Sequence, residues 1–162
     1  MIAFEVLELR HRQPVMAIFN DYVVNTFAAF PSRPLPEPFF EKILEKSYGY
    51  PAYAVTDGPT VIGFCFLSPY SPMDTFRETA TVTYFIAPKH TSGGIGSRAL
   101  ERLLTDARKM GLRHIVAEIS SKNEVSLAFH RKHGFEVRGT LRGIGRKHGE
   151  SFDLVLMQKS LA

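Results

Sequence analysis

The sequence lacks long apolar runs, has a single cysteine and carries no strong excess of charge of either sign. No stretch of about 18 apolar residues occurs, so we expect no membrane-spanning helix and no membrane partner. Cys65 excludes an internal disulfide, and its apolar neighbours predict a small buried side chain. The first residues lack a basic segment followed by an apolar run, so we expect no secretory signal and a cytoplasmic location.

The charge is modestly basic, with a formal net charge of +4 at pH 7. This balance suits a small anionic ligand, and no basic stripe interleaved with aromatic residues occurs, so we expect no nucleic-acid partner. No internal repeat or low-complexity segment is visible. With 162 residues and 44% hydrophobic content, the chain is expected to form one domain, residues 1–162, with its own core.

Apolar periodicity and turn residues predict an α/β fold with a mixed sheet and helices on both faces. Asp57-Gly58 marks a hairpin turn, and four prolines between positions 31 and 38 mark a loop. The antiparallel part of the sheet comes first, and a β–α–β crossover follows. The predicted strands are 4–9, 52–56, 61–67, 79–86, 113–119, 135–139 and 152–158, and the predicted helices are 14–27, 39–46, 94–110 and 123–132.

Residues 81–111 hold the most informative pattern: an apolar strand, a glycine-rich loop and an amphipathic helix. This order directs several backbone N–H groups and the positive end of a helix dipole at one spot, which suits a phosphate or pyrophosphate. A P-loop is excluded, because Gly96 is followed by Ser97-Arg98 rather than by Lys and then Ser or Thr. A helix start that merely needs a tight turn is the simplest alternative.

A dinucleotide-binding fingerprint is a second alternative for the same glycines. Gly94-x-Gly96-x-x-Ala99 satisfies G-x-G-x-x-A, and Glu118 ends the next predicted strand about 20 residues on, where a ribose-binding acid would lie. Too few residues follow Glu118 for the rest of such a sheet, and an antiparallel hairpin precedes the motif. Both facts disfavour this alternative.

A third interpretation uses more of the chain. Thr91-x-x-Gly94-x-Gly96 resembles the Q/R-x-x-G-x-G/A coenzyme A motif of the GNAT superfamily of N-acetyltransferases. The segment Asn123-x-x-Ser126-x-x-x-His130-x-x-x-Gly134-Phe135 resembles the second signature of that superfamily, N-x-x-A/S-x-x-x-Y-x-x-x-G-F. The spacing between the two segments also fits, and the resemblance spans almost the whole chain.

Four further segments narrow the resemblance to the phosphinothricin and methionine sulfoximine acetyltransferase branch. They are Ile18-Phe19-Asn20 with Thr26, Arg77-x-Thr79-x-Thr81, His130 in place of Tyr, and Gly145-x-Lys147-His148-Gly149-x-x-x-Asp153. The resemblance implies a twisted central sheet of about seven strands and transfer of an acetyl group from acetyl-CoA to the primary amine of a small molecule. It also implies a homodimer and no metal.

The resemblance assigns cofactor-binding roles residue by residue. The pyrophosphate would lie on the backbone of Ser92, Gly93, Gly94, Ile95, Gly96 and Ser97, and the pantetheine arm would lie along Tyr84, Phe85 and Ile86. The N–H of Ile86 is expected to polarise the thioester carbonyl. Asn123 and Lys132 occupy further cofactor positions, and Asn123 as a simple helix cap is an alternative that does not conflict.

The chain departs from the branch at two positions. Thr91 replaces the usual Gln or Arg, and Thr81 replaces the Glu that would act as base. Glu118 is the leading substitute base, because ribosomal-protein alanine N-acetyltransferases resemble this chain in having Glu there; pairing with Arg113 or Lys122 is its alternative. His130 is the candidate general acid, or a residue that only lines the pocket.

The acceptor site is expected to draw on residues 20–30 and 70–77. Arg77 is the candidate partner for an acidic group on the acceptor, and Phe27 and Thr81 are further substrate-binding candidates. Two other functions stay open at this stage. One is acetylation of protein N-termini, which Glu118 favours, and the other is a coenzyme A-binding module without catalysis, which Thr81 favours.

Overall fold

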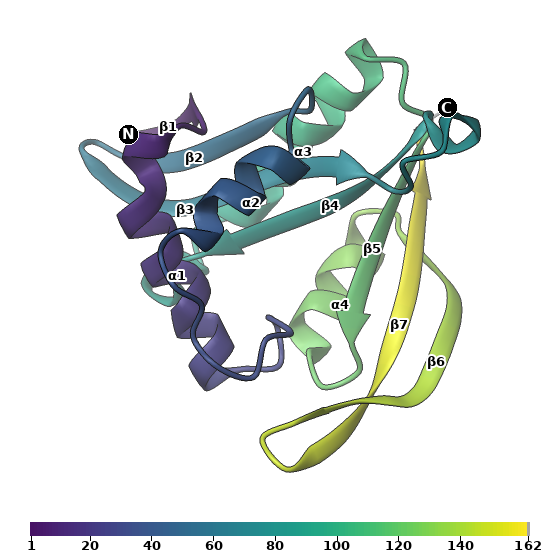
Figure 1. Cartoon of the computed structure of the whole chain (residues 1–162). Helices are drawn as coiled ribbons and strands as arrows, with labels where there is room; N and C mark the ends of the chain where they lie inside the picture. Colours follow the sequence, from purple (N-terminus) through teal and green to yellow (C-terminus); the bar gives the residue numbers. More distant parts are fainter. Residues whose placement is uncertain (162) are drawn as a thin grey trace.

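The computed structural model describes residues 1–161, which form a seven-stranded sheet in the order β1-β2-β3-β4-β5-β7-β6 (Figure 1). Among these strands only β4 and β5 pair in parallel, through the crossover helix α3. The strands are β1 Ile2–Val6, β2 Ala52–Asp57, β3 Thr60–Pro69, β4 Thr79–Ile86, β5 His114–Ser120, β6 Glu136–Lys147 and β7 Glu150–Ser160. The helices are α1 Arg12–Asn25, α2 Phe39–Lys46, α3 Ile95–Lys109 and α4 Glu124–Lys132. The mixed sheet predicted from the sequence is confirmed.

Helices cover both faces of the sheet because β3 is apolar on both sides. Phe64 and Phe66 pack with α1 and α2, whereas Cys65 and Leu67 belong to the core cluster that α3 completes. Successive strand residues point to opposite faces, so one buried strand supplies two cores. No helix within residues 1–161 has the length and apolar character needed to span a membrane.

The strands β4 and β5 pair over only three residues and then diverge (Figure 1). Thr79 to Thr81 lie opposite His114 to Val116, and beyond that point β4 runs on to Ile86 and β5 to Ser120. The separation leaves one backbone edge of each strand without a neighbouring strand inside the sheet. An extended ligand can pair with such an edge as an added strand does.

The β6–β7 hairpin is longer than the sequence pattern predicted. The expected strands 135–139 and 152–158 extend to Glu136–Lys147 and Glu150–Ser160, joined at His148 (φ 53°) and Gly149 (φ 75°). Glycine and arginine dominate residues 138–146, so no apolar alternation marks them as a strand. Pairing with the apolar β7 imposes the strand, with register shifts after Val137 and Leu141.

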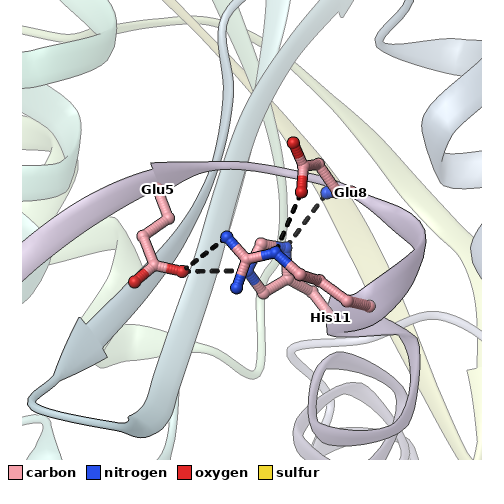
Figure 2. A network of polar contacts seen from close by, with 4 residues as sticks. Glu5, Glu8 and His11 are labelled. Carbon is pink, nitrogen blue, oxygen red and sulfur yellow. Dashed lines mark hydrogen bonds and ion pairs between the residues drawn. The ribbon is translucent and has the colours of Figure 1, made fainter.

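The first strand and the first helix also differ from the prediction. The strand ends at Val6 rather than at residue 9, and α1 begins at Arg12 rather than at residue 14. A short turn, Leu9–His11, lies between them, and it is held by the network drawn in Figure 2. The N–H of Glu8 donates to His11 Nδ1 at 3.0 Å, so the ring donates from Nε2 to Glu5 Oε1 at 3.1 Å. That bond, with Arg10 beside it, lowers the pKa of Glu5.

Candidate functional site

A large cavity opens where β4 and β5 diverge, with a volume of about 930 Å³. Its walls come from α1 and α2 on one face of the sheet and from α3 and α4 on the other. The sequence-predicted residues that line it are Phe27, Thr81, Tyr84, Phe85, Ile86, Gly94, Gly96, Ser97, Glu118, Asn123 and His130. The cavity therefore crosses the sheet, and two substrates can approach one another from opposite faces.

The backbone of β4 presents alternate residues to the cavity. The N–H of Ala87 donates to Ile62 and the N–H of Tyr70 donates to Thr79, so the odd-numbered residues of β4 bond to β3. The N–H and C=O groups of Val82, Tyr84 and Ile86 consequently point toward the gap between β4 and β5. These groups suit an extended amide-bearing chain, as predicted for the pantetheine arm.

The glycine loop ends in a left-handed residue that begins α3. Gly94 has φ +73°, a conformation in which a side chain is strained, and no side chain caps the helix start. The first-turn N–H groups and the positive helix end are thus left for an anion. Thr91, Gly94, Gly96 and Ser97 line the cavity. Of the other predicted loop residues, Ser92, Gly93 and Ile95 are not among the cavity-lining residues, and the Ile95 side chain is buried in the core.

The helix α4 forms a second wall on the same face of the sheet as α3. Asn123 caps this helix by accepting a hydrogen bond from the Ser126 N–H at 3.2 Å, and it also lines the cavity, so the capping role and a ligand-binding role are compatible. The Ser97 hydroxyl lies 3.0 Å from His133 Nε2, which joins the start of α3 to the C-terminal end of α4. Lys132 is exposed and is not among the cavity-lining residues.

His130 is buried, and both of its ring nitrogens are used. Nδ1 lies 2.7 Å from the carbonyl oxygen of Ser126, and Nε2 contacts the hydroxyl of Tyr84. Burial lowers the pKa of His130 and raises the pKa of Tyr84, so both side chains are held in their neutral forms. Tyr84 was predicted only for its backbone, and its hydroxyl adds a polar group to the wall.

Glu118 stands on the same face of the sheet as Thr81. Thr81 pairs with Val116 in the parallel ladder, and Glu118 lies two residues further along β5, so all three side chains project from one face. The Glu118 side chain is exposed, lines the cavity and forms no ion pair within residues 1–161. Lys122, its expected partner, instead pairs with Glu150 at 3.2 Å. A carboxylate therefore faces the acceptor side from the neighbouring strand.

The loop after α1 closes the acceptor side and is held by the β6–β7 hairpin. Lys147 is only 3% exposed and donates from Nζ to the carbonyl oxygen of Ala29, and burial lowers the pKa of Lys147. Phe30 stacks on Phe152 with ring centroids 6.0 Å apart, and Phe27 meets the same ring at 6.1 Å. The cavity wall formed by this loop thus depends on residues more than 100 positions away in the chain.

Other residues that were predicted to form the acceptor site lie elsewhere in the structure. Arg77 and the rest of residues 70–77 are not among the cavity-lining residues. Asn20 clamps the backbone of Leu35 through two hydrogen bonds of 2.8 and 2.9 Å, which shapes the loop between α1 and α2. The lysines that line the cavity are Lys42 and Lys46 on α2, and Lys122 after β5, which pairs with Glu150.

Tyr22 is a cavity residue that the sequence patterns did not single out. Its hydroxyl donates to the carbonyl oxygen of Ile86, and burial raises the pKa of Tyr22. In the sequence, Tyr22 stands at helical spacing with Val15 and Ile18, a pattern that predicts only a residue of the buried helix face. Across residues 1–161, no three His, Cys, Asp or Glu side chains gather closely enough to hold a metal ion.

Comparison with known proteins matches this architecture to a family. The model of the acetyltransferase (GNAT) family matches residues 15–135, and the chain belongs to that family. It is 32% identical over 152 residues to the L-methionine sulfoximine/L-methionine sulfone acetyltransferase of Pseudomonas aeruginosa, which covers 91% of this chain and 87% of the relative.

Solved structures share the whole fold. A phosphinothricin acetyltransferase from Sinorhizobium meliloti in complex with acetyl-CoA matches with a TM-score of 0.93 at 25% identity, covering 99% of this chain and 89% of its own. A ribosomal-protein-alanine N-acetyltransferase from Brucella melitensis matches with a TM-score of 0.90 at 30% identity, covering 98% and 99%. The predicted GNAT fold and the acetyltransferase activity class are confirmed.

Proposed function

We propose that this protein transfers the acetyl group of acetyl-CoA to the primary amine of a small amino-acid-like molecule, such as methionine sulfoximine or phosphinothricin. The observation that most supports this proposal is the cavity that crosses the sheet at the β4–β5 gap. Its α3 side offers uncapped helix N–H groups for a pyrophosphate, and its α1–α2 side offers Glu118 with Lys42 and Lys46. The similarity to amino-acid-analogue acetyltransferases supports this substrate class.

The proposed chemistry is direct attack of the neutral amine on the thioester. An alkyl amine resembles Lys, with a pKa of about 10.4, so nearly all of it is protonated at pH 7 and needs a base. Glu118 takes that role, because it is an unpaired carboxylate on the face that Thr81 shares. The N–H of Ile86 points into the gap and stabilises the oxyanion that forms.

The remaining residues bind rather than react. Gly94, Gly96 and Ser97 hold the pyrophosphate end, and Asn123 lines the cavity from the opposite end of α4, while Phe27 and Thr81 face the acceptor. The ligand contacts predicted for Arg77 and Lys132 stay predictions, because neither residue is among those that line the cavity. We further propose that residues 1–162 act as one domain, in a cytoplasmic homodimer.

The test is a panel of acceptors assayed by thiol release: methionine sulfoximine, methionine sulfone, phosphinothricin, ordinary amino acids and peptides that begin with alanine. We expect turnover of the free amino-acid analogues with acetyl-CoA and none with the peptides. Acetyl-CoA is also expected to raise the melting temperature, because it binds the folded state alone. A melting temperature that rises without turnover of any amine would leave only a coenzyme A-binding module.

A second candidate function is acetylation of protein N-termini. The observations that favour it are Glu118 and the overall match to a ribosomal-protein-alanine N-acetyltransferase. The loop after α1, tied down by Lys147, closes the acceptor side and favours a small molecule over a protein segment. Turnover of alanine-initial peptides above that of the free analogues would reverse this preference.

A further inference from the structure

We propose that Tyr84 is a catalytic residue, and that its hydroxyl, hydrogen-bonded to His130, carries a proton from the attacking nitrogen to the departing sulphur. This inference deepens the proposed function and rests on it. The residue lies on β4, where its backbone faces the gap, and it is one of the residues that line the cavity. None of the roles predicted for Tyr84 from the sequence involved its side chain.

The direction of the hydrogen bonds follows from the chemistry of the partners. The carbonyl oxygen of Ser126 can only accept, so the nitrogen that contacts it, His130 Nδ1 at 2.7 Å, carries the hydrogen. In the neutral ring, Nε2 is then an acceptor, and the hydroxyl of Tyr84 donates to it. The chain of bonds therefore runs from Tyr84 through His130 to the backbone of α4.

The surroundings hold this pair in place. The His130 ring packs edge-on against Phe135 with centroids 4.9 Å apart, and the Tyr84 ring packs edge-on against Phe129 at 5.8 Å. Burial opposes charge on either partner, so the resting pair is a phenol and a neutral imidazole. A neutral imidazole with a free lone pair directed at a phenol is able to take its proton.

Both nitrogens of His130 are occupied, so the Tyr84 oxygen is the atom of the pair that can meet a substrate. This oxygen uses its hydrogen for His130 and keeps its lone pairs. The general-acid role predicted for His130 is thus divided. Tyr84 touches the reacting atoms, and His130 positions the hydroxyl and stores its proton.

The proposed step moves one proton in two stages. Glu118 first takes one proton from the ammonium group and passes it to water. As the C–N bond forms, the nitrogen loses a second proton to the Tyr84 oxygen, and the original Tyr84 proton moves to His130 Nε2. As the C–S bond breaks, Tyr84 gives a proton to the sulphur, and His130 returns its extra proton to Tyr84. The pair ends as it began, and the products are the amide and the free thiol, with no further reactant.

The experiment compares Tyr84→Phe with the unmodified protein, using an acceptor that the unmodified protein acetylates. We expect kcat to fall by about 10- to 100-fold, at or below the low end of general acid–base effects because a thiolate is a good leaving group. The melting-temperature rise with acetyl-CoA should remain. In mixtures of H₂O and D₂O, the rate of the unmodified protein should fall along a curve, which indicates several moving protons, and that of Tyr84→Phe along a straight line.

The matched control is Tyr53→Phe. Tyr53 is likewise a strand tyrosine that donates to a titratable side chain, Asp106; it is buried and lies outside the cavity lining. This variant should keep kcat and the curved response. A second test variant, His130→Gln, can accept a hydrogen bond from Tyr84 but cannot store a proton. Its kcat should fall as much as that of Tyr84→Phe. The double variant with both substitutions should show no larger fall in kcat than either single variant.

Three outcomes separate the hypotheses. If Tyr84→Phe keeps kcat within about twofold, or keeps the curved isotope response, the relay is wrong while acetyl transfer stands. If Tyr84→Phe does not fold, His130→Gln decides in the same way. If the unmodified protein acetylates no amine on the panel, the proposed function fails, and the relay fails with it.

Discussion

The two ends of the cavity are built in different ways. The anion cradle at the α3 end comes from one continuous segment, residues 81–97, in which strand, loop and helix follow one another and Gly94 sets the turn, and α4 adds a wall beside it. The acceptor end is assembled from the α1–α2 loop, from Glu118 on β5 and from the β6–β7 hairpin, which contacts the loop through Lys147 and Phe152. The first end is local in sequence, and the second exists only after the chain has folded.

This difference predicts that a substitution that impairs binding at one end of the cavity can leave binding at the other end unchanged. An anion cradle at a helix start depends on local backbone geometry, so distant substitutions should spare acetyl-CoA binding. The acceptor wall depends on long-range packing, so a change in the hairpin should reach the acceptor without touching the cradle. Three substitutions test this separation, and a fourth prediction concerns the pH dependence of stability.

The largest effect is expected from Glu118→Gln, which removes the proposed base at the acceptor end. We expect kcat to fall by about 10²- to 10⁴-fold, the usual range for loss of a positioned base. Acetyl-CoA should still raise the melting temperature, because the α3 end is unchanged. Glu136→Gln, on exposed strand β6, is the control and should keep full activity. Unchanged kcat from pH 6 to 9 in Glu118→Gln would remove this residue from the base role.

The next effect is expected from Gly145→Ala in the hairpin. A Cβ at this position would lie 2.1 Å from the ring of Phe152, so the ring has to move. We expect the free energy of unfolding to drop by about 1–3 kcal/mol, as for other overpacked sites, and the KM for the acceptor to rise. The dissociation constant for acetyl-CoA should stay the same, and calorimetry would measure it.

Gly139→Ala is the matched control for the hairpin. It lies on the same strand, with ordinary φ and no atom within 4 Å of an added Cβ. It should leave the acceptor KM unchanged. An equal rise in the acetyl-CoA dissociation constant in Gly145→Ala would show that the two ends are coupled.

A smaller effect is expected from Gly94→Ala at the cofactor end. The position has φ +73°, so the side chain is strained there whatever space it has, at a cost of about 1 kcal/mol. We expect weaker acetyl-CoA binding and an unchanged acceptor KM at saturating acetyl-CoA. Gly49→Ala, with φ +80°, open surroundings and a position outside the cavity lining, should cost similar stability without affecting acetyl-CoA binding.

The smallest expected effect is a pH dependence of the free energy of unfolding that arises from two histidines, one in α4 and one at its C-terminal end. Burial lowers the pKa of His130 and His133 below the ordinary value of about 6.5, so the unfolded chain binds protons more readily there. The free energy of unfolding should therefore fall as pH drops below about 6.5, and be fully present above it. Urea denaturation between pH 7.5 and 5.5 measures this slope, and His130→Gln should flatten it. The lowered pKa of Glu5 acts only at lower pH.

Much of the fold was predictable because its signals are local. The strand Thr79–Ile86 and the helix Phe39–Lys46 have the predicted bounds, and Asn123 caps α4 as expected. The long β6 was missed, because its stretch of Gly and Arg takes its strand form from β7 rather than from its own pattern. The predicted contact of Arg77 with the acceptor depends on loop placement, which no periodicity encodes.

The sequence alone determined the family, the mixed sheet and the anion cradle at Gly94, because turns, helix starts and strand alternation are set by neighbouring residues. Tertiary structure decided the rest of the site. It brought the Tyr84 hydroxyl to His130 and set Glu118 on the face of Thr81. It also joined Lys147 to Ala29 across the loop. Contacts between residues far apart in the chain depend on how the strands diverge and the helices pack, and no local pattern specifies that.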